Sequence, residues 1–388
     1  MTVHERNGTV RTEVAIVGGG VVGAAILHEL SHRGVDAVLL EREADLAYGA
    51  SGTNSGVLHT GFDSTPGELE TELILRAARR RGRVLEALGV PVLPCGAELV
   101  PRSDAERETV RELARNAAAN GVAHEIRAGD GALLVPGESV TDPVALTIAL
   151  AASAVVAGGA VLRSAEVVGI EPRADDLELR TSDGRPLRSR IVVNAAGLLA
   201  DRVARLVGDD SFEIYPRKGE FLVFELPGGR TLDRILLPVP TKRTKGVLVF
   251  PTLDGRVVAG PTAVDLVDKD DWSVRPEAVE EILGKAVAQF PALAGLTPIA
   301  SYAGLRPAGR DTNYRIGRSP ACAALINVAA IRSTGLSAGL GIAEYVAELI
   351  AAEGIEVGEP RDPEPAPRVE PSEWWRRTAR LRASGAAT

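Results

Sequence analysis

Runs of apolar residues near the start of the chain predict two buried strands separated by one helix. Residues 14–17 (Val-Ala-Ile-Val) and 38–40 (Val-Leu-Leu) are continuous apolar runs of strand length, and the Ala- and Leu-rich stretch between them ends at Gly34. Short continuous runs of this kind are typical of strands that are covered on both faces, as in a parallel sheet. The pattern therefore predicts a strand–helix–strand crossover over residues 14–41.

The rest of the chain alternates between helical spacing and short strand-like runs. Helical spacing predicts helices over residues 68–87, 104–120, 143–157, 276–290 and about 336–352. Short apolar or alternating runs predict strands over residues 90–100, 160–163, 167–170, 177–181, 191–193, 220–224, 247–250, 256–259, 299–305 and 325–330. Asp142-Pro143 has the residues of a helix start, and Asp254-Gly255 those of a hairpin turn.

A glycine-rich turn joins the first strand to its helix. Gly18, Gly20 and Gly23 meet the G-x-G-x-x-G template for binding a dinucleotide. Gly18 allows the tight turn, Gly20 lets a pyrophosphate approach the backbone, and Gly23 lets the helix pack against the strand. The positive end of the helix dipole then faces the phosphates. Glu41, at the end of the second strand, can accept hydrogen bonds from the adenosine ribose.

Three later stretches of small residues also follow predicted strands or precede predicted helices. Candidate cofactor contacts in these stretches are Ser51, Thr53, Asn54, Ser55, Gly56, Ala196, Gly197, Ser333, Gly335, Leu336 and Ser337. Long ordered loops rich in small polar residues can hold backbone donors against a ligand. Several separate loops suit FAD, a long molecule, better than NAD, so the sequence predicts an FAD site.

The order of the elements predicts the fold class and the domains. Between residues 214 and 260 strands follow one another without helices, which is typical of an antiparallel sheet. We therefore predict an α/β fold, with a Rossmann-like FAD-binding domain and an inserted antiparallel β-rich substrate domain. The first domain is assigned to residues 10–87, 140–212 and 300–352, and the second to 88–139 and 213–299. Residues 353–388 form a C-terminal tail, expected to pack on its own domain or on a neighbour.

Composition narrows the class of protein further. The 388 residues are 45% hydrophobic and 25% charged, with a net charge of -8, which is ordinary for a globular protein and disfavours nucleic acid as a partner. Two cysteines without C-x-x-C spacing predict no disulfide framework and no metal site. The sequence has neither a signal-peptide pattern nor an apolar run long enough to span a bilayer, so a cytoplasmic location is expected. Peripheral membrane contact and the oligomeric state are left open.

A resemblance to a known family appears at residues 51–66. The stretch 51–63 (Ser-Gly-Thr-Asn-Ser-Gly-Val-Leu-His-Thr-Gly-Phe-Asp), followed by Thr65-Pro66, resembles the flavin loop of the short glycerol-3-phosphate oxidases, in the D-amino-acid-oxidase-like superfamily of FAD enzymes. Residues 216–220, 238–242, 260–263, 268–270 and 304–307 are similar to the same family. The resemblance covers residues 14 to about 350. The helix start at 333–339 departs from it, because it lacks a proline usual there and is preceded by Arg332.

The resemblance implies an FAD-dependent oxidoreductase. FAD would be bound noncovalently, and the enzyme would oxidise the secondary alcohol of a small anionic substrate, glycerol 3-phosphate, by hydride transfer to the flavin. Oxygen or another acceptor would then take the electrons. His59 matches the family's general base, and Lys269 and Arg306 match its active-site lysine and arginine. Together with Arg332 these residues are the predicted substrate site. Related short enzymes oxidise 2-hydroxyglutarate or amines, and these substrates remain alternatives.

The residues themselves leave other interpretations open. A histidine suits proton transfer near neutral pH, but His59 could also brace its loop or anchor the flavin covalently. Arg306 can clamp a phosphate or carboxylate at two points, whereas Lys269, among acidic residues, could simply form an ion pair. The arginines at 76, 79, 80, 81 and 83 are expected on a solvated helix face. A noncatalytic FAD-binding protein is the alternative from another class.

Overall fold

The predicted crossover is present at the start of the chain. In the computed structural model, which describes residues 4–6, 9–241, 246–363, 373–377 and 379, strand β2 (Thr9–Val17) leads into helix α1 (Val21–His32) and strand β3 (Ala37–Leu40). β2 and β3 pair in parallel, with Val14 opposite Ala37. Gly18 turns the chain with a φ of 113°, a conformation that glycine adopts without strain.

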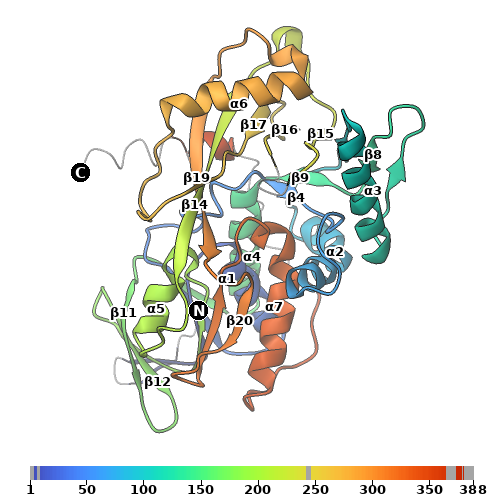
Figure 1. Cartoon of the computed structure of the whole chain (residues 1–388). Helices are drawn as coiled ribbons and strands as arrows, with labels where there is room; N and C mark the ends of the chain where they lie inside the picture. Colours follow the sequence, from blue (N-terminus) through green and yellow to red (C-terminus); the bar gives the residue numbers. More distant parts are fainter. Residues whose placement is uncertain (1–3, 7–8, 242–245, 364–372, 378, 380–388) are drawn as a thin grey trace.

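A largely parallel sheet forms around this crossover (Figure 1). Its parallel part runs in the order β10–β3–β2–β13–β21, and an antiparallel meander, β13–β12–β11, extends it. β1 and β20 add antiparallel pairs to β2 and β21. The bounds of these strands are His4–Arg6 (β1), Ala160–Leu162 (β10), Val167–Pro172 (β11), Leu177–Thr181 (β12), Pro186–Asn194 (β13), Arg315–Arg318 (β20) and Leu325–Ala329 (β21).

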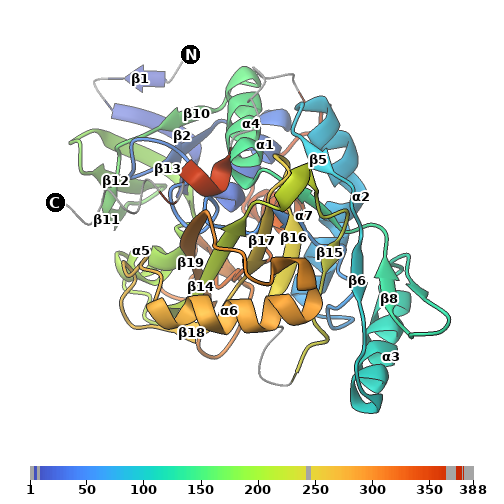
Figure 2. The same ribbon diagram turned by 90° about the horizontal axis from the view of Figure 1, so that it is seen from above.

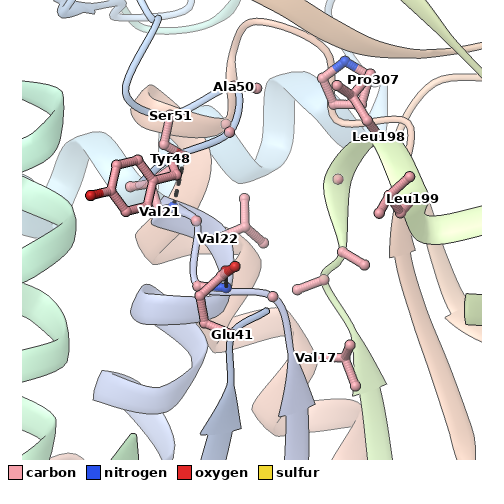
Figure 3. A pocket seen from close by; sticks show the side chains of 18 of the residues that line it. Val17, Val21, Val22, Glu41, Tyr48, Ala50, Ser51, Leu198, Leu199 and Pro307 are labelled. Atoms are coloured by element: carbon pink, nitrogen blue, oxygen red, sulfur yellow. Dashed lines mark hydrogen bonds between the residues drawn. The ribbon is translucent and has the colours of Figure 1, made fainter. Parts of the chain in front are cut away.

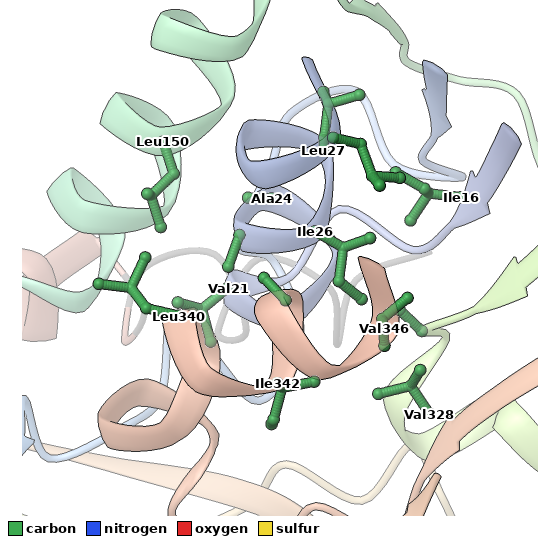
Figure 4. Packing of buried hydrophobic residues seen from close by; sticks show 14 of the residues in the cluster. Ile16, Val21, Ala24, Ile26, Leu27, Leu150, Val328, Leu340, Ile342 and Val346 are labelled. Atoms are coloured by element: carbon green, nitrogen blue, oxygen red, sulfur yellow. The ribbon is translucent and has the colours of Figure 1, made fainter. Parts of the chain in front are cut away.

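Helices cover one face of this sheet, and on the other face buried residues of β2, β3 and β21 pack with residues of β11 and β12 and with Val203. α1 packs against α4 (Pro143–Val156) and α7 (Gly335–Ala351), and buried Val21, Leu150 and Leu340 meet between them (Figure 4). Asp142 caps α4, since its carboxylate accepts from the Val144 and Ala145 amides at 2.8 and 2.9 Å. The helices α2 (Leu69–Ala87) and α5 (Ala200–Arg205) and the 3₁₀ turn η1 (Gly197–Leu199) complete this domain.

A second, mostly antiparallel sheet forms the other domain, beneath helix α6 (Figures 1 and 2). Its order is β18–β14–β17–β16–β15–β6–β8–β7, and β19 pairs with the free edge of β14. The strands of this sheet are Ala97–Leu99 (β6), Glu125–Ile126 (β7), Leu133–Val135 (β8), Ile214–Phe224 (β14), Ile235–Leu236 (β15), Leu248–Pro251 (β16), Val257–Gly260 (β17), Val264–Asp265 (β18) and Ala300–Gly309 (β19). The helices of this domain are Asp104–Ala119 (α3) and Pro276–Gln289 (α6), and its 3₁₀ turns are Pro227–Gly229 (η2) and Pro291–Leu293 (η3).

Three predicted boundaries need correction. Residues 300–309 were assigned to the FAD-binding domain, but β19 pairs with β14 along its whole length and so belongs to the substrate sheet.

The predicted strand 90–100 is two strands: β5 (Val92–Leu93) joins β4 (Val57–Leu58) and β9 (Ser139–Thr141) in a small sheet, whereas β6 joins the large one. Pro94 has no amide donor and Gly96 has a φ of 66°, so the chain turns between them. The strand predicted at 191–193 begins at Pro186: its first half contains the polar run 188–190 (Arg-Ser-Arg) and alternates between exposed and buried positions, so the apolar run marks only its second half.

The described part of the tail packs on its own chain. This segment includes a short helix beside the substrate domain (Figure 2, red). Trp374 and Trp375 are each 1% exposed and join the core of that domain, where the Trp374 ring meets Tyr302 edge to face. Arg377 donates to Asp45 and Leu46 on the loop that follows β3. The tail therefore connects the two domains, and the alternative of packing on a neighbour is not needed for these residues.

Candidate functional site

A cavity of about 190 Å³ lies over the carboxyl ends of three parallel strands (Figure 3). Val17 ends β2, Glu41 follows β3, and Ala195 follows β13. Dinucleotides bind at this edge of an open α/β sheet. Predicted cofactor residues that line it are Gly18, Gly20, Glu41, Ser51, Asn54, Ala196, Gly197, Ser333, Gly335 and Leu336.

The glycine turn leaves no room for side chains. A Cβ on Gly18 would lie 2.5 Å from the Ala195 oxygen, and one on Gly23 would lie 2.0 Å from the Gly18 oxygen. Because Gly18 has no side chain, β2 can come close to the end of β13. Because Gly23 has none, α1 can come close to β2. Both approaches shape the cavity floor as the motif predicts.

Glu41 and Ser51 organise the backbone around this floor. The Glu41 carboxylate accepts from the Gly19 amide at 2.6 Å and from the Glu43 amide at 2.8 Å, and burial raises the pKa of Glu41. The Ser51 hydroxyl accepts from the Val21 amide at 2.9 Å, in the first turn of α1. A carboxylate oxygen has two lone pairs, so Glu41 retains capacity for a ribose hydroxyl.

Other predicted cofactor residues lie elsewhere. Thr53 and Ser55 line a neighbouring cavity. Gly56 lies against β9, where a Cβ would come 2.4 Å from the Thr141 oxygen, and the Ser337 hydroxyl accepts from the His59 amide at 2.8 Å. Gly56 and Ser337 therefore support the loop from behind instead of lining either cavity.

The neighbouring cavity has a volume of about 230 Å³ and lies between the two domains. Ala50, Asn54, Arg332 and Ser333 line both cavities, so the two cavities adjoin at these residues. Its walls include His59 on the first domain and strands β14 and β19 on the second. Two adjoining cavities suit a long cofactor and a small substrate that meet at the junction.

His59 is held by residues that sequence analysis did not single out. Its Nδ1 lies 2.9 Å from Oε2 of Glu138, a side chain with 0% exposure. Arg81 donates from Nη1 to the His59 carbonyl oxygen at 3.1 Å. The prediction of a solvated face is therefore wrong for Arg81, since it points inward from α2 and burial lowers its pKa. Glu138, on a turn before β9, carries no local motif.

Arg306 faces the second cavity from β19. Its Nε donates to the backbone carbonyl oxygen of Arg217 at 3.0 Å. Its Nη2 donates to the backbone carbonyl oxygens of Lys218 (3.0 Å) and Thr262 (2.8 Å). Burial and the charge of nearby Arg217 lower the pKa of Arg306 to about 10, so the guanidinium is still charged at neutral pH. Within the described chain, Nη1 makes no hydrogen bond to protein, and it is the group available to an anion.

Arg332 and Lys269 differ in their relation to this cavity. Arg332 lines both cavities, has a φ of 56°, and donates to Glu70 at 2.6 Å. Lys269 lines only the first cavity, where its Nζ lies 2.7 and 2.8 Å from the two oxygens of buried Asp201. The structure thus brings His59, Arg306 and Arg332 together, and it does not bring Lys269 to them.

Two further properties concern the residues that the structure describes. No helix in this part of the chain is long and apolar enough to cross a membrane. Within the same residues, no group of three or more His, Cys, Asp or Glu side chains could hold a metal ion.

Comparison with known proteins gives consistent matches. The family model described as FAD dependent oxidoreductase matches residues 13–349. A glycerol 3-phosphate dehydrogenase from Caloramator mitchellensis is 31% identical over 353 residues, 87% of this chain and 73% of that protein. An L-2-hydroxyglutarate dehydrogenase from Escherichia coli (strain K12) is 30% identical over 294 residues, 71% of this chain and 70% of that protein. The solved structure of dithionite-reduced L-alpha-glycerophosphate oxidase from Mycoplasma pneumoniae with FAD bound has a TM-score of 0.85 and 26% identity, covering 92% of this chain and 100% of that one.

Proposed function

Because the chain belongs to the FAD-dependent oxidoreductase family, we propose that it oxidises the secondary alcohol of a small anionic substrate, glycerol 3-phosphate, to dihydroxyacetone phosphate. The observation that carries this proposal is the second cavity, in which His59, paired with the buried carboxylate of Glu138, and the Arg306 guanidinium face one space. Alcohol oxidation needs a proton acceptor beside the hydroxyl, and an anionic substrate needs a fixed cation.

The first cavity would hold FAD. The glycine turn leaves room for phosphates at the start of α1, Glu41 can bind the ribose, and the residues shared by the two cavities would lie beside the flavin ring. When bound, FAD supplies the hydride acceptor. Oxygen or another acceptor would reoxidise it.

The chain's own groups have distinct roles in this proposal. His59 takes the hydroxyl proton, and Arg306 binds the anionic group through Nη1. Arg332 lies at the junction of the cavities, but its charge is offset by Glu70 at 2.6 Å, so it contributes less to anion binding. Lys269 is assigned to the cofactor side, where it compensates the buried charge of Asp201.

A 2-hydroxy acid such as 2-hydroxyglutarate is a second candidate substrate. A relative that covers 71% of this chain bears that activity in its name, and a guanidinium binds a carboxylate as well as a phosphate. Glycerol 3-phosphate is preferred because relatives named for it match a larger share of the chain, 87% against 71%.

The purified protein is expected to be yellow and to release FAD on denaturation. A Gly20→Val variant should be colourless, because its Cβ would already lie 3.1 Å from the Ser51 hydroxyl and its methyl groups would occupy the pyrophosphate path. Gly82→Val is a matched control, since Gly82 is exposed on α2 with no atom within 4 Å of an added Cβ. The measurement is the flavin absorbance per chain. A Gly20→Val variant with full FAD content would contradict the assignment of the first cavity.

A further inference from the structure

His59 and Glu138 form a pair that is held in place by other residues. Oε2 of Glu138 lies 2.9 Å from the His59 Nδ1, while Oε1 accepts from the Thr60 amide at 2.6 Å and from the Thr60 hydroxyl at 2.8 Å. Arg81 donates to the His59 carbonyl oxygen, and its positive charge attracts the negative charge of the Glu138 carboxylate. Both oxygens of a fully buried carboxylate therefore have partners in fixed directions.

We propose that Glu138 is a positioning residue that sets the tautomer of His59. An ionised carboxylate can only accept hydrogen bonds, so Nδ1 must carry the proton in their contact. Nε2 is then the ring nitrogen that carries the lone pair, and so the one that can take the proton of a substrate hydroxyl. This inference rests on the proposed role of His59 as base and adds the residue that makes the imidazole ready for it.

The contact also affects the charge that forms during the reaction. When Nε2 takes a proton, the ring becomes an imidazolium, and the adjacent carboxylate stabilises it. Charged groups that share the cavity with His59 are Asp63, Glu70, Arg217, Arg306 and Arg332, and Arg81 approaches from behind. The arginine charges in this set would disfavour the imidazolium, so a buried carboxylate in direct contact offsets them.

Glu138→Gln tests the tautomer directly. The Thr60 amide is a fixed donor, so the carbonyl of the introduced glutamine should stay on Thr60 and its NH₂ group should donate to Nδ1 of His59. Nδ1 then becomes the acceptor and the proton moves to Nε2. The measurement is the pair of ¹⁵N imidazole shifts in histidine-labelled protein near pH 8, with His59 assigned from the His59→Gln variant. The parent is expected to show a protonated Nδ1, and Glu138→Gln a protonated Nε2.

Glu138→Gln should also slow reduction of the flavin by substrate about 10- to 100-fold with FAD content unchanged. A loss of this size is expected when a residue that orients an active-site side chain by a hydrogen bond is replaced. The acid limb of the variant's pH profile should move to lower pH, because the imidazolium has lost its carboxylate. Glu125→Gln is the matched control: the same change at an exposed glutamate of β7, which lines neither cavity, should leave tautomer and rate unchanged. Glu138→Asp, which retains a carboxylate, should recover part of the rate.

The results distinguish this inference from the proposed function. A parent protein with the proton on Nε2 overturns the role of Glu138, and this measurement needs no variant to fold. An unchanged tautomer and rate in folded Glu138→Gln would do the same. If the tautomer changes as expected but neither candidate substrate reduces the parent flavin, the role of Glu138 stands and the proposed function fails.

Discussion

His59→Gln is expected to slow reduction of the flavin by substrate roughly 10²- to 10⁴-fold while FAD remains bound, the usual contribution of a general base. Glutamine is close to histidine in size but cannot take a proton at neutral pH. The rate is measured by anaerobic stopped-flow absorbance over a range of pH. The parent rate should fall at low pH as the imidazole becomes protonated, and the variant should lack this limb.

The same variant separates the three interpretations of His59. If the side chain mainly braced its loop, loss of the Glu138 contact would lower both the melting temperature and the FAD content. If it were a covalent anchor, acid precipitation of the parent would leave the yellow colour with the protein. A folded, FAD-loaded His59→Gln enzyme that reduces its flavin at the parental rate would exclude His59 as the base.

Replacing Arg306 is expected to weaken substrate binding by about 2–5 kcal/mol, the cost of losing a charged partner in a closed site. Arg306→Met removes the charge, and Arg306→Lys keeps the charge but loses the planar fork that donates to Arg217, Lys218 and Thr262. Both variants should raise KM far more than they lower the rate at saturation, Met more than Lys. Steady-state kinetics with FAD content measured in parallel is the test.

Arg310→Met provides the matched control for this experiment. Arg310 lies one residue beyond β19, is exposed, and pairs with Glu213 at 2.8 Å on the surface. Exposed pairs contribute little, so KM should not change. Equal KM values for parent, Arg306→Met and Arg310→Met would remove Arg306 from the substrate site.

The fold could be predicted from sequence where local pattern and tertiary environment agree. The crossover over residues 14–41 combines buried apolar runs, required glycines and a terminal acid, and the structure places all of them as expected. The family and FAD as cofactor are confirmed by the match over residues 13–349, and the α/β class is confirmed by the sheet topology and the match to a solved structure. Residues 300–309 were misassigned because a strand's own pattern does not reveal which sheet it joins; their pairing partner is β14, about 85 residues earlier in the chain.

The site was harder to predict because its parts meet only in three dimensions. Glu138 lies 79 residues from His59 in sequence, and a single glutamate before a short strand has no distinguishing context. Arg81 lies among four other arginines on one helix, and only the packing of α2 shows that it points inward. Lys269 was grouped with Arg306 by resemblance, yet its side chain pairs with Asp201 in the first cavity.

Anaerobic mixing of the FAD-loaded protein with glycerol 3-phosphate tests the central claim most directly. Loss of flavin absorbance is followed beside the same measurement with 2-hydroxyglutarate, and with glycerol, which has the alcohol but no anionic group. We predict rapid bleaching by glycerol 3-phosphate, slower bleaching by 2-hydroxyglutarate and none by glycerol. A flavin that stays oxidised with both anions, in protein that chemical dithionite reduces fully, would contradict the account.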